Sequence, residues 1–186
     1  VIDPDIHAVD RYLSVAAALG VSPPDKPRFG FKLLEEDMAA VREIAERRGF
    51  SVDKPWIAMS IGARWPTKRW PLESFAAVVD QLYEARRDAL VMIGGSEERA
   101  FTKKLKALTK SPFIDLCGDI PLGCLPALLS TSTAMITNDS GPMHIAAALG
   151  IPVIAMFGPT SAARTGPYGT GHHVLSGQVS CSPCFS

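Results

Sequence analysis

The sequence predicts an α/β protein with a Rossmann-like parallel sheet that carries helices on both faces. From residue 56 onward, short apolar runs of strand length alternate with amphipathic helical patterns, and repeated strand–helix–strand units build parallel sheets. Of the 186 residues, 47% are hydrophobic, which is enough to form a core on both sides of such a sheet.

Residues 1–54 are less regular than the rest of the chain. Apolar residues at helical spacing predict a helix over Ala8–Leu19, followed by a Pro-rich loop. Arg28–Leu33 is predicted as a short strand and Glu35–Arg48 as a second helix. Because too few apolar residues remain for a separate core, we interpret 1–54 as an interdomain connector and the end of a further N-terminal domain.

Residues 55–178 are predicted to form one domain. The expected strands are Trp56–Ile61, Ala89–Ile93, Phe113–Leu116, Ala134–Thr137 and Pro152–Phe157. The expected helices are Pro71–Arg86, a segment through Phe101, Leu105 and Leu108, a helix that begins near Cys124, and Pro142–Leu149. Folds of this kind bind ligands beyond the carboxyl ends of their strands, so the loops after the strands are where a site is expected.

The composition narrows the classes of function. Lys+Arg and Asp+Glu are both 19, and this balance argues against a nucleic-acid binder, which normally carries a basic excess. No apolar run approaches the roughly 18 residues of a membrane span, and no signal peptide is visible. The 4 cysteines are too few for a disulfide scaffold, so we expect a reducing, cytosolic setting.

The loop after the first predicted strand gathers positive charge. Arg64, Lys68 and Arg69 lie just ahead of the helix that begins at Pro71. Cations beside a helix N-terminus are suited to binding a pyrophosphate. A solvated basic loop with two core tryptophans explains the same residues equally well, so both interpretations stay open.

A glycine-rich turn, 94–98, follows the second predicted strand. Its glycines allow a ligand to approach the backbone, and the carboxylate of Glu97 can accept hydrogen bonds from a ribose diol. A tight turn in which Ser96 caps a helix is the favoured interpretation of this stretch taken alone. Neither G-x-G-x-x-G nor the P-loop motif is present, so the redox Rossmann and P-loop classes are excluded.

A polar turn follows the fourth predicted strand. Asp139 falls at the strand end, and Ser140 and Gly141 lead into a helix whose free N–H groups can hold a phosphate while Asp139 takes sugar hydroxyls. His144, one turn inside the helix, points back towards the same end, and Thr160 in the next loop joins the same rim. The alternative is a capped turn without a ligand, because these residue types are common in turns.

The last residues, 179–186, are expected to form a tail with a C-x-x-C pair, Cys181 and Cys184. Half a metal site or a redox pair are the chemical alternatives to a noncatalytic role. Since no second ligand pair is evident, no metal is expected.

Taken together, these motifs resemble glycosyltransferase family 9, the heptosyltransferases of lipopolysaccharide core synthesis. Ile136–Gly150, continued through Phe157–Thr160, is similar to the family signature. The segments Lys68–Pro71 and Gly94–Glu97 match family motifs at the expected spacings. His7–Gly20 resembles the segment before the family's second domain. The resemblance covers nearly the whole chain but only the C-terminal half of the family's length.

The resemblance implies the GT-B fold, two Rossmann-like domains that face each other across a cleft. The C-terminal domain of the family binds the sugar nucleotide, typically ADP-heptose. Its N-terminal domain carries the lipopolysaccharide acceptor site and the carboxylate base of an inverting displacement. This chain would then be the donor-binding half, inactive alone, with its own N-terminal domain as partner. Neither a cofactor nor a metal is implied, and the setting is the cytoplasm, with peripheral association at the inner face of the inner membrane.

The resemblance also implies roles for individual residues. Lys68 would contact the phosphates and stabilise the leaving group, Glu97 would hold the ribose, and the backbone near Ile120 would contact adenine. The expected substrate-binding residues are Arg64, Lys68, Glu97, Ile120, Asp139, Ser140, Gly141, His144 and Thr160. Two alternatives are a noncatalytic nucleotide-binding module and another GT-B-like sugar-nucleotide enzyme such as an epimerase.

Overall fold

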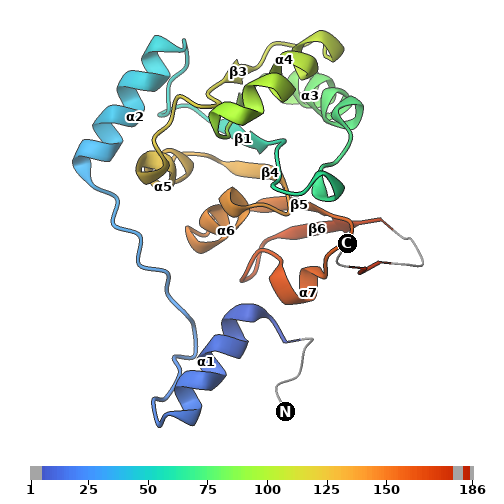
Figure 1. Cartoon of the computed structure of the whole chain (residues 1–186). Coiled ribbons are helices and arrows are strands. Elements are labelled where there is room, and N and C mark those ends of the chain that lie inside the picture. The colour runs from blue at the N-terminus through green and yellow to red at the C-terminus, as the bar shows by residue number, and fades with distance from the viewer. Residues whose placement is uncertain (1–5, 178–181, 185–186) are drawn as a thin grey trace.

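A computed structural model describes residues 6–177 and 182–184 of the chain (Figure 1). Its centre is a 6-stranded parallel sheet with the order β3-β2-β1-β4-β5-β6. The strands are β1 Trp56–Ser60, β2 Ala89–Met92, β3 Ile114–Asp115, β4 Ala134–Asn138, β5 Val153–Phe157 and β6 His173–Ser176. The chain runs outward from β1 to β3, returns to the other side of β1 as β4, and continues to β6. The strand order therefore reverses between β1 and β4, where doubly wound folds open a ligand crevice.

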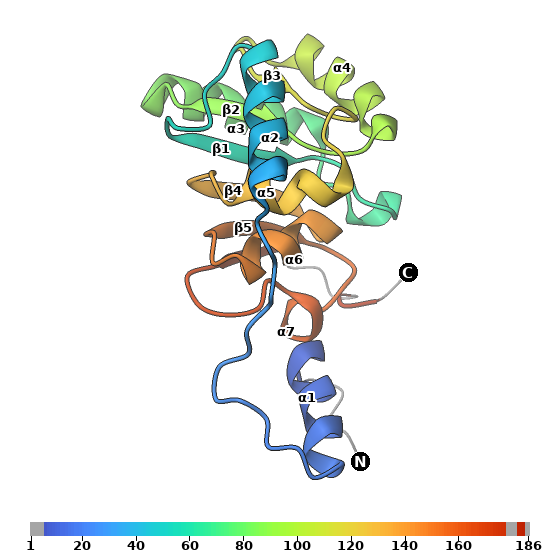
Figure 2. The same cartoon turned by 90° about the vertical axis from the view of Figure 1, so that its left-hand side faces the viewer.

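Helices cover both faces of the sheet. The helices are α1 Ala8–Ala18, α2 Glu35–Arg47, α3 Leu72–Arg86, α4 Arg99–Leu108, α5 Leu125–Leu129, α6 Gly141–Ala148 and α7 Ala162–Thr165, with 3-10 turns η1 Pro66–Lys68, η2 Ser96–Glu98 and η3 Leu122–Cys124. Figures 1 and 2 show α2 and α5 on one face and α3 on the other. The expected fold class, a Rossmann-like parallel sheet with helices on both faces, is confirmed.

The core is divided by the sheet into two apolar clusters. Successive residues of β1 point to opposite faces, so Trp56 packs in the cluster under α2, α5 and α6, and Met59 packs in the cluster under α3 and α4. Both side chains are fully buried. This two-sided burial explains why the strands read as continuous apolar runs rather than as an alternating pattern.

The apolar side of α2 belongs to the core of the sheet domain. Val41, Ile44 and Ala45 of α2 are buried, and so are Phe50 and Val52 in the segment that leads to β1. The boundary that we expect between residues 54 and 55 remains a prediction. The core itself takes side chains from both sides of that boundary.

The segment that precedes α2 packs much less. No residue of α1 is buried, and its contacts to the rest of the chain include a ring nitrogen of His7 that lies 3.0 Å from the carbonyl oxygen of Gly166. The expected strand at Arg28–Leu33 is wrong: this segment is irregular, and Phe29, Phe31 and Leu33 are all at least 40% exposed. Its apolar residues alternate as in a strand, but the segment runs outside the sheet and pairs with none of its strands (Figure 2).

Two elements at the other end of the domain were not expected from the sequence. The short helix α7 follows β5, and β6 then pairs in parallel with β5 at the edge of the sheet. All of β6 is exposed, and its apolar run is limited to Val174 and Leu175, which is too short to predict a strand. Of the C-terminal cysteine pair, Cys181 lies outside the described residues, and Cys184 is exposed. No described helix is long and apolar enough to cross a membrane.

Candidate functional site

The reversal of strand order brings two loops together that are far apart in the sequence. Ser60 of β1 lies beside Thr137 of β4, so the two strands end at the same level. The loop after β1 and the turn after β4 meet there. Lys68 Nζ donates to Asp139 Oδ2 at 2.6 Å, and the side chains are only 22% and 6% exposed. An ion pair sheltered in this way is less screened than a surface pair.

Asp139 also connects the loop after β5 to this contact. Thr160 Oγ1 donates to the same carboxylate oxygen, Oδ2, at 2.7 Å. The carboxylate therefore lies where the loops after β1, β4 and β5 converge. Three of the residues expected from the sequence, Lys68, Asp139 and Thr160, form this cluster, which we call the Asp139 cluster.

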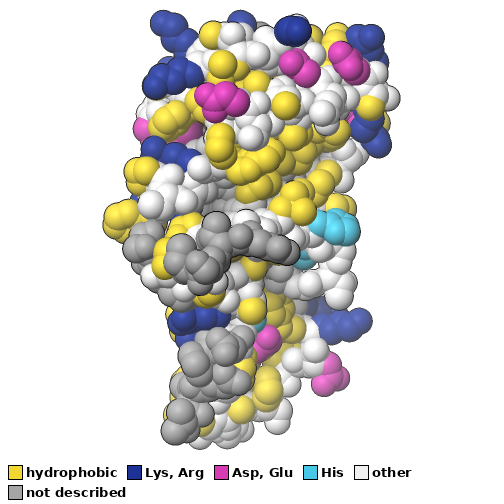
Figure 3. All heavy atoms as spheres, turned by 90° about the vertical axis from the view of Figure 1, so that its right-hand side faces the viewer, with side chains coloured by type: hydrophobic (Ala, Val, Ile, Leu, Met, Phe, Trp, Pro, Cys, Tyr) yellow, Lys and Arg dark blue, Asp and Glu magenta, His cyan; other side chains and the backbone are white. Residues whose placement is uncertain are grey.

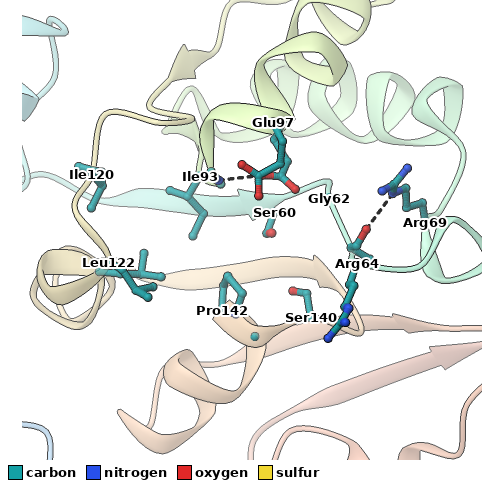
Figure 4. A pocket seen from close by; sticks show the side chains of 16 residues that line it. Ser60, Gly62, Arg64, Arg69, Ile93, Glu97, Ile120, Leu122, Ser140 and Pro142 are labelled. Atoms are coloured by element: carbon teal, nitrogen blue, oxygen red, sulfur yellow. Dashed lines mark hydrogen bonds between the residues drawn. The ribbon is translucent and has the colours of Figure 1, made fainter.

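A cavity of about 630 Å³ lies along the carboxyl ends of β1, β2 and β4 (Figure 4). One end is apolar, where Ile93, Ile120 and Leu122 gather, and the other is polar, with Arg64 and Ser140 (Figure 4). The full lining is Ser60, Gly62, Ala63, Arg64, Arg69, Ile93, Gly94, Gly95, Glu97, Glu98, Ile120, Leu122, Leu125, Ser140, Gly141 and Pro142. The volume suits a ligand of nucleotide size, and the two ends suit a flat apolar group and a charged group.

The glycine-rich turn after β2 separates the roles of its two glutamates. Glu98 Oε2 accepts a hydrogen bond from the backbone N–H of Gly95 at 2.7 Å, and burial, with the charge of Glu97 next, raises the pKa of Glu98. Glu97 is exposed at the cavity, and its carboxylate makes no hydrogen bond with another described residue. Glu98 therefore stabilises the turn through this hydrogen bond, and the carboxylate of Glu97 remains accessible to a ligand. Ser96 makes no capping hydrogen bond, so that interpretation of the turn is wrong.

The polar turn after β4 presents the start of α6 to the cavity. Ser140 has extended backbone angles at the N-cap, makes no capping hydrogen bond, and keeps its hydroxyl 3.0 Å from that of Thr137. The first N–H groups of α6, including that of Gly141, have no partner within the helix. Asp139 is held by Lys68 and Thr160 instead of capping the helix, so the interpretation as a capped turn is wrong.

His144 lies on the other side of α6. It lines a second, mostly apolar cavity of about 360 Å³ between α1 and α6, with His7, Phe31 and Tyr168. His144 keeps an exposed edge, but loss of hydration around the rest of the ring lowers its pKa. The negative charge of Asp139 opposes that shift. His144 therefore lies within electrostatic range of Asp139 and Lys68 but does not line the larger cavity.

The structure places the expected residues in three groups. Arg64, Glu97, Ile120, Ser140 and Gly141 line the larger cavity. Lys68, Asp139 and Thr160 form the adjoining cluster, and His144 faces the second cavity.

Arg69 is a lining residue that the sequence analysis placed among the cations of this loop but not among the expected substrate-binding residues. Its Nε donates to the carbonyl oxygen of Ala63 at 2.9 Å, and its guanidinium lies 4.8 Å from the ring centre of Phe101. Trp65 in the same loop is 58% exposed to solvent, while Trp70 packs against Phe75 with ring centres 5.1 Å apart. The interpretation as a solvated basic loop with two core tryptophans is therefore wrong for Lys68, Arg69 and Trp65. The three cations within residues 64–69 were the sequence feature that pointed to a role for Arg69.

Comparison with known proteins decides the family. The family model described as glycosyltransferase family 9 (heptosyltransferase) matches residues 1–186. The chain belongs to glycosyltransferase family 9. Similar family members include lipopolysaccharide heptosyltransferase 2 of Salmonella typhimurium, 33% identical over 166 residues, and lipooligosaccharide heptosyltransferase 2 of Haemophilus influenzae, 32% identical over 169 residues. Each alignment covers 86% of this chain and 48% or 49% of the relative. The chain thus spans about half the length of these family 9 relatives.

Solved structures of the family show the same architecture. A family 9 glycosyltransferase from Veillonella parvula matches with a TM-score of 0.85 and 31% identity, over 92% of this chain and 49% of that one. The Escherichia coli ADP-heptose lipopolysaccharide heptosyltransferase II matches with a TM-score of 0.75 and 26% identity, over 94% of this chain and 56% of that one. The sheet and its covering helices are therefore those of one half of a family 9 enzyme.

The surface agrees with the balanced composition. On the face drawn in Figure 3, basic and acidic side chains are mixed, and apolar side chains lie between them. This face carries no continuous basic surface of the kind that binds nucleic acid.

Proposed function

We propose that this chain is the donor-binding half of an inverting glycosyltransferase that transfers heptose from ADP-heptose to a lipopolysaccharide inner-core acceptor. The observation that supports it best is the Asp139 cluster beside a cavity with one apolar and one cationic end. In this proposal the adenine lies at the Ile120 end, with Glu97 on the ribose and the diphosphate near Arg64, Lys68 and the start of α6.

The charges at this site suit a reaction in which a diphosphate is the leaving group. Displacement at the anomeric carbon leaves negative charge on the diphosphate, and preorganised cations and helix N–H groups stabilise such charge strongly. Lys68 supplies a point charge, Ser140 and Gly141 supply donors, and Asp139 supplies an acceptor for sugar hydroxyls. Thr160, which donates to Asp139, completes the surroundings of the sugar in this proposal. His144, which faces the second cavity, acts on them only through its electrostatic interaction with Asp139 and Lys68.

The acceptor side of the reaction is proposed to lie in an N-terminal domain of the same protein. The chain spans about half of its relatives, and an inverting displacement needs a base on the acceptor side of the anomeric carbon. We propose that the whole enzyme works in the cytoplasm at the inner face of the inner membrane. The lipopolysaccharide named for the relatives is a lipid-bearing acceptor, which supports this location.

Titration calorimetry with ADP, UDP and NAD tests the donor site directly. We expect ADP to bind most tightly, because the cavity pairs an apolar slot with a cationic end. Equal or tighter binding of NAD would contradict the proposal.

Transfer assays separate the two halves of the reaction. We expect the 186-residue chain, given ADP-heptose and a lipopolysaccharide core acceptor, to bind the donor without transferring sugar. The reason is that the proposed N-terminal domain is needed to position the acceptor. Fusion to its N-terminal domain should restore transfer. Robust transfer by the chain alone would place the base here, and an epimerised sugar nucleotide as product would favour the epimerase alternative.

A further inference from the structure

Asn138, the last residue of β4, reaches out of its own strand to the loop after β1. Its side chain is completely buried, at 0% exposure, although it is polar. Nδ2 donates to the carbonyl oxygens of Ile61 and Gly62 at 2.8 and 3.3 Å, and Oδ1 accepts from the backbone N–H of Trp70 at 3.0 Å. One amide group therefore contacts both the beginning and the end of the same loop.

The loop between these contacts carries the cations of the site. Arg64, Lys68 and Arg69 all lie between Gly62 and Trp70. Regular structure within the loop is limited to the short turn η1, and one further internal tie joins Arg69 Nε to Ala63. The position of the loop above the sheet thus depends on contacts made from outside it, and Asn138 makes those at its base.

The chemistry of this contact requires an amide. The loop offers two carbonyl oxygens that need donors and one N–H that needs an acceptor, and an asparagine side chain provides both functions in one group. A carboxylate would lose both donors, and an aliphatic side chain would lose every contact. Because the group is buried, unpaired loop atoms could not recover these hydrogen bonds from water without the loop moving.

We propose that Asn138 is a positioning residue that closes the base of the cationic loop and so sets where Lys68 and the two arginines meet the diphosphate of the donor. This inference rests on the proposed donor-binding function. Asn138 itself touches no reacting atom, since its hydrogen bonds go to Ile61, Gly62 and Trp70.

Amide hydrogen exchange of the ligand-free chain tests the structural part. In the wild-type protein the N–H of Trp70 should be protected, as expected for a buried hydrogen bond. In Asn138→Leu, which keeps the branched shape of the side chain but is larger and has no polar atoms, exchange across residues 62–70 should rise by about tenfold or more while β2 and β3 keep their protection. A matched control is Thr102→Val, which removes a buried hydroxyl whose hydrogen bonds go to Arg99 and Asp115 and not to the loop.

Titration with ADP tests the functional part. Asn138→Leu should weaken ADP binding about tenfold, a factor that misplacing charge-assisted contacts can readily account for. The affinity of Asn138→Leu should also fall less steeply with added salt than that of the wild type, because fewer cations reach the diphosphate. Thr102→Val should bind ADP like the wild type, even if its stability falls equally.

Several outcomes would overturn the proposal. These are a wild-type Trp70 N–H that exchanges as fast as exposed loop amides, loop exchange in Asn138→Leu that matches Thr102→Val, or unchanged ADP affinity in Asn138→Leu. If Asn138→Leu does not fold, Asn138→Ser carries the same two measurements, with smaller shifts expected. If wild-type protein does not bind ADP, the donor-binding function fails, and the exchange data still decide whether Asn138 holds the loop.

Discussion

The two walls of the site, the loop after β1 and the turn after β4, are built in different ways. The loop, residues 61–70, carries the cations and has little internal structure apart from η1. The turn passes directly from the buried end of β4 into α6, with Asn138 at 0% and Asp139 at 7% exposure. Hydrogen bonds run from the turn to the loop through both of these side chains.

The difference shows how the charges of one wall are positioned by the other. The strand and helix that flank the turn fix its backbone locally. The loop is fixed by side chains that come from residues 138 and 139, about seventy positions later in the sequence. Changes in the loop should therefore act chiefly on the chemistry, whereas changes in the turn should affect both the position of the loop and the binding of the ligand.

The largest expected effect comes from the loop wall. In the complete enzyme Lys68→Ala should reduce the transfer rate by roughly 10²–10³-fold, because it removes a preorganised donor from developing negative charge. The substitution also leaves the buried carboxylate of Asp139 with Thr160 as its partner, so the free energy of unfolding should fall as well. Rate measurements at saturating donor, together with thermal unfolding, check both expectations.

Lys68→Arg is the control for charge alone. It should also lose activity, since a planar guanidinium cannot occupy the position of an ammonium equally well. Wild-type turnover in Lys68→Ala would show that Lys68 has no role in transfer and would remove the functional distinction between the two walls.

A smaller and more selective effect is expected from the turn wall. Asp139→Ala should give a folded protein that binds the whole sugar nucleotide about tenfold more weakly, because a charged acceptor of sugar hydroxyls is lost. Binding of free ADP should change little, since Asn138 still holds the base of the loop and the phosphates retain Lys68 and the N–H groups of α6. Calorimetry with both ligands measures the difference.

The matched variant for this prediction is Thr160→Val, which removes a partner of Asp139 and keeps the carboxylate. It should affect the sugar nucleotide less than Asp139→Ala does. A lower melting temperature of Asp139→Ala with unchanged affinity for the sugar nucleotide would mean that Asp139 serves only the fold.

The smallest expected effect is a pH dependence of stability from His144. The pKa of His144 is lowered in the folded protein, chiefly by desolvation. As the pH falls, this side chain therefore becomes protonated at a higher pH in the unfolded chain than in the folded one. Stability from this group is therefore complete above the ordinary histidine pKa of about 6.5 and is lost as the pH falls towards the lower folded value. Urea unfolding at a series of pH values measures this slope.

His144→Gln should flatten that slope, and His173→Gln on the exposed strand β6 is the control. In Asp139→Ala the slope should steepen, because the charge that opposes the shift is gone. An unchanged slope in both the His144 and Asp139 variants would show that the turn wall does not reach the far side of α6.

The regular part of the fold was predictable from the sequence, and its limits have physical reasons. The strands buried on both faces were found from their apolar runs, within one or two residues. β6 was missed because the exposed edge strand His173–Ser176 has only two apolar residues, Val174 and Leu175, in its run. Arg28–Leu33 was predicted as a strand because Phe29, Phe31 and Leu33 alternate, but pattern alone cannot supply a neighbouring strand.

The site was predictable where charge or a turn motif marked it. The pairing of Lys68 with Asp139 follows from the rule that places loops at the carboxyl edge, although no local pattern reveals which atoms meet. The apolar wall at Leu122 and Leu125 carries no motif that distinguishes it from core residues. Asn138 belonged to a generic polar turn, and only its three long-range hydrogen bonds identify what it holds.

The reversal of strand order between β1 and β4 also has a consequence for how the protein folds. β1 pairs with β2 after a connection through one helix, but its pairing with β4 closes a much longer stretch of chain that includes β2, α4, β3 and α5. Contacts between residues so distant in sequence carry a larger loop-closure entropy and tend to slow folding. The two walls of the site lie on the two strands that this pairing joins. The appearance of ADP affinity during refolding would therefore report the docking of β4 onto β1, and ADP added to a refolding sample would favour the chains in which that step is complete.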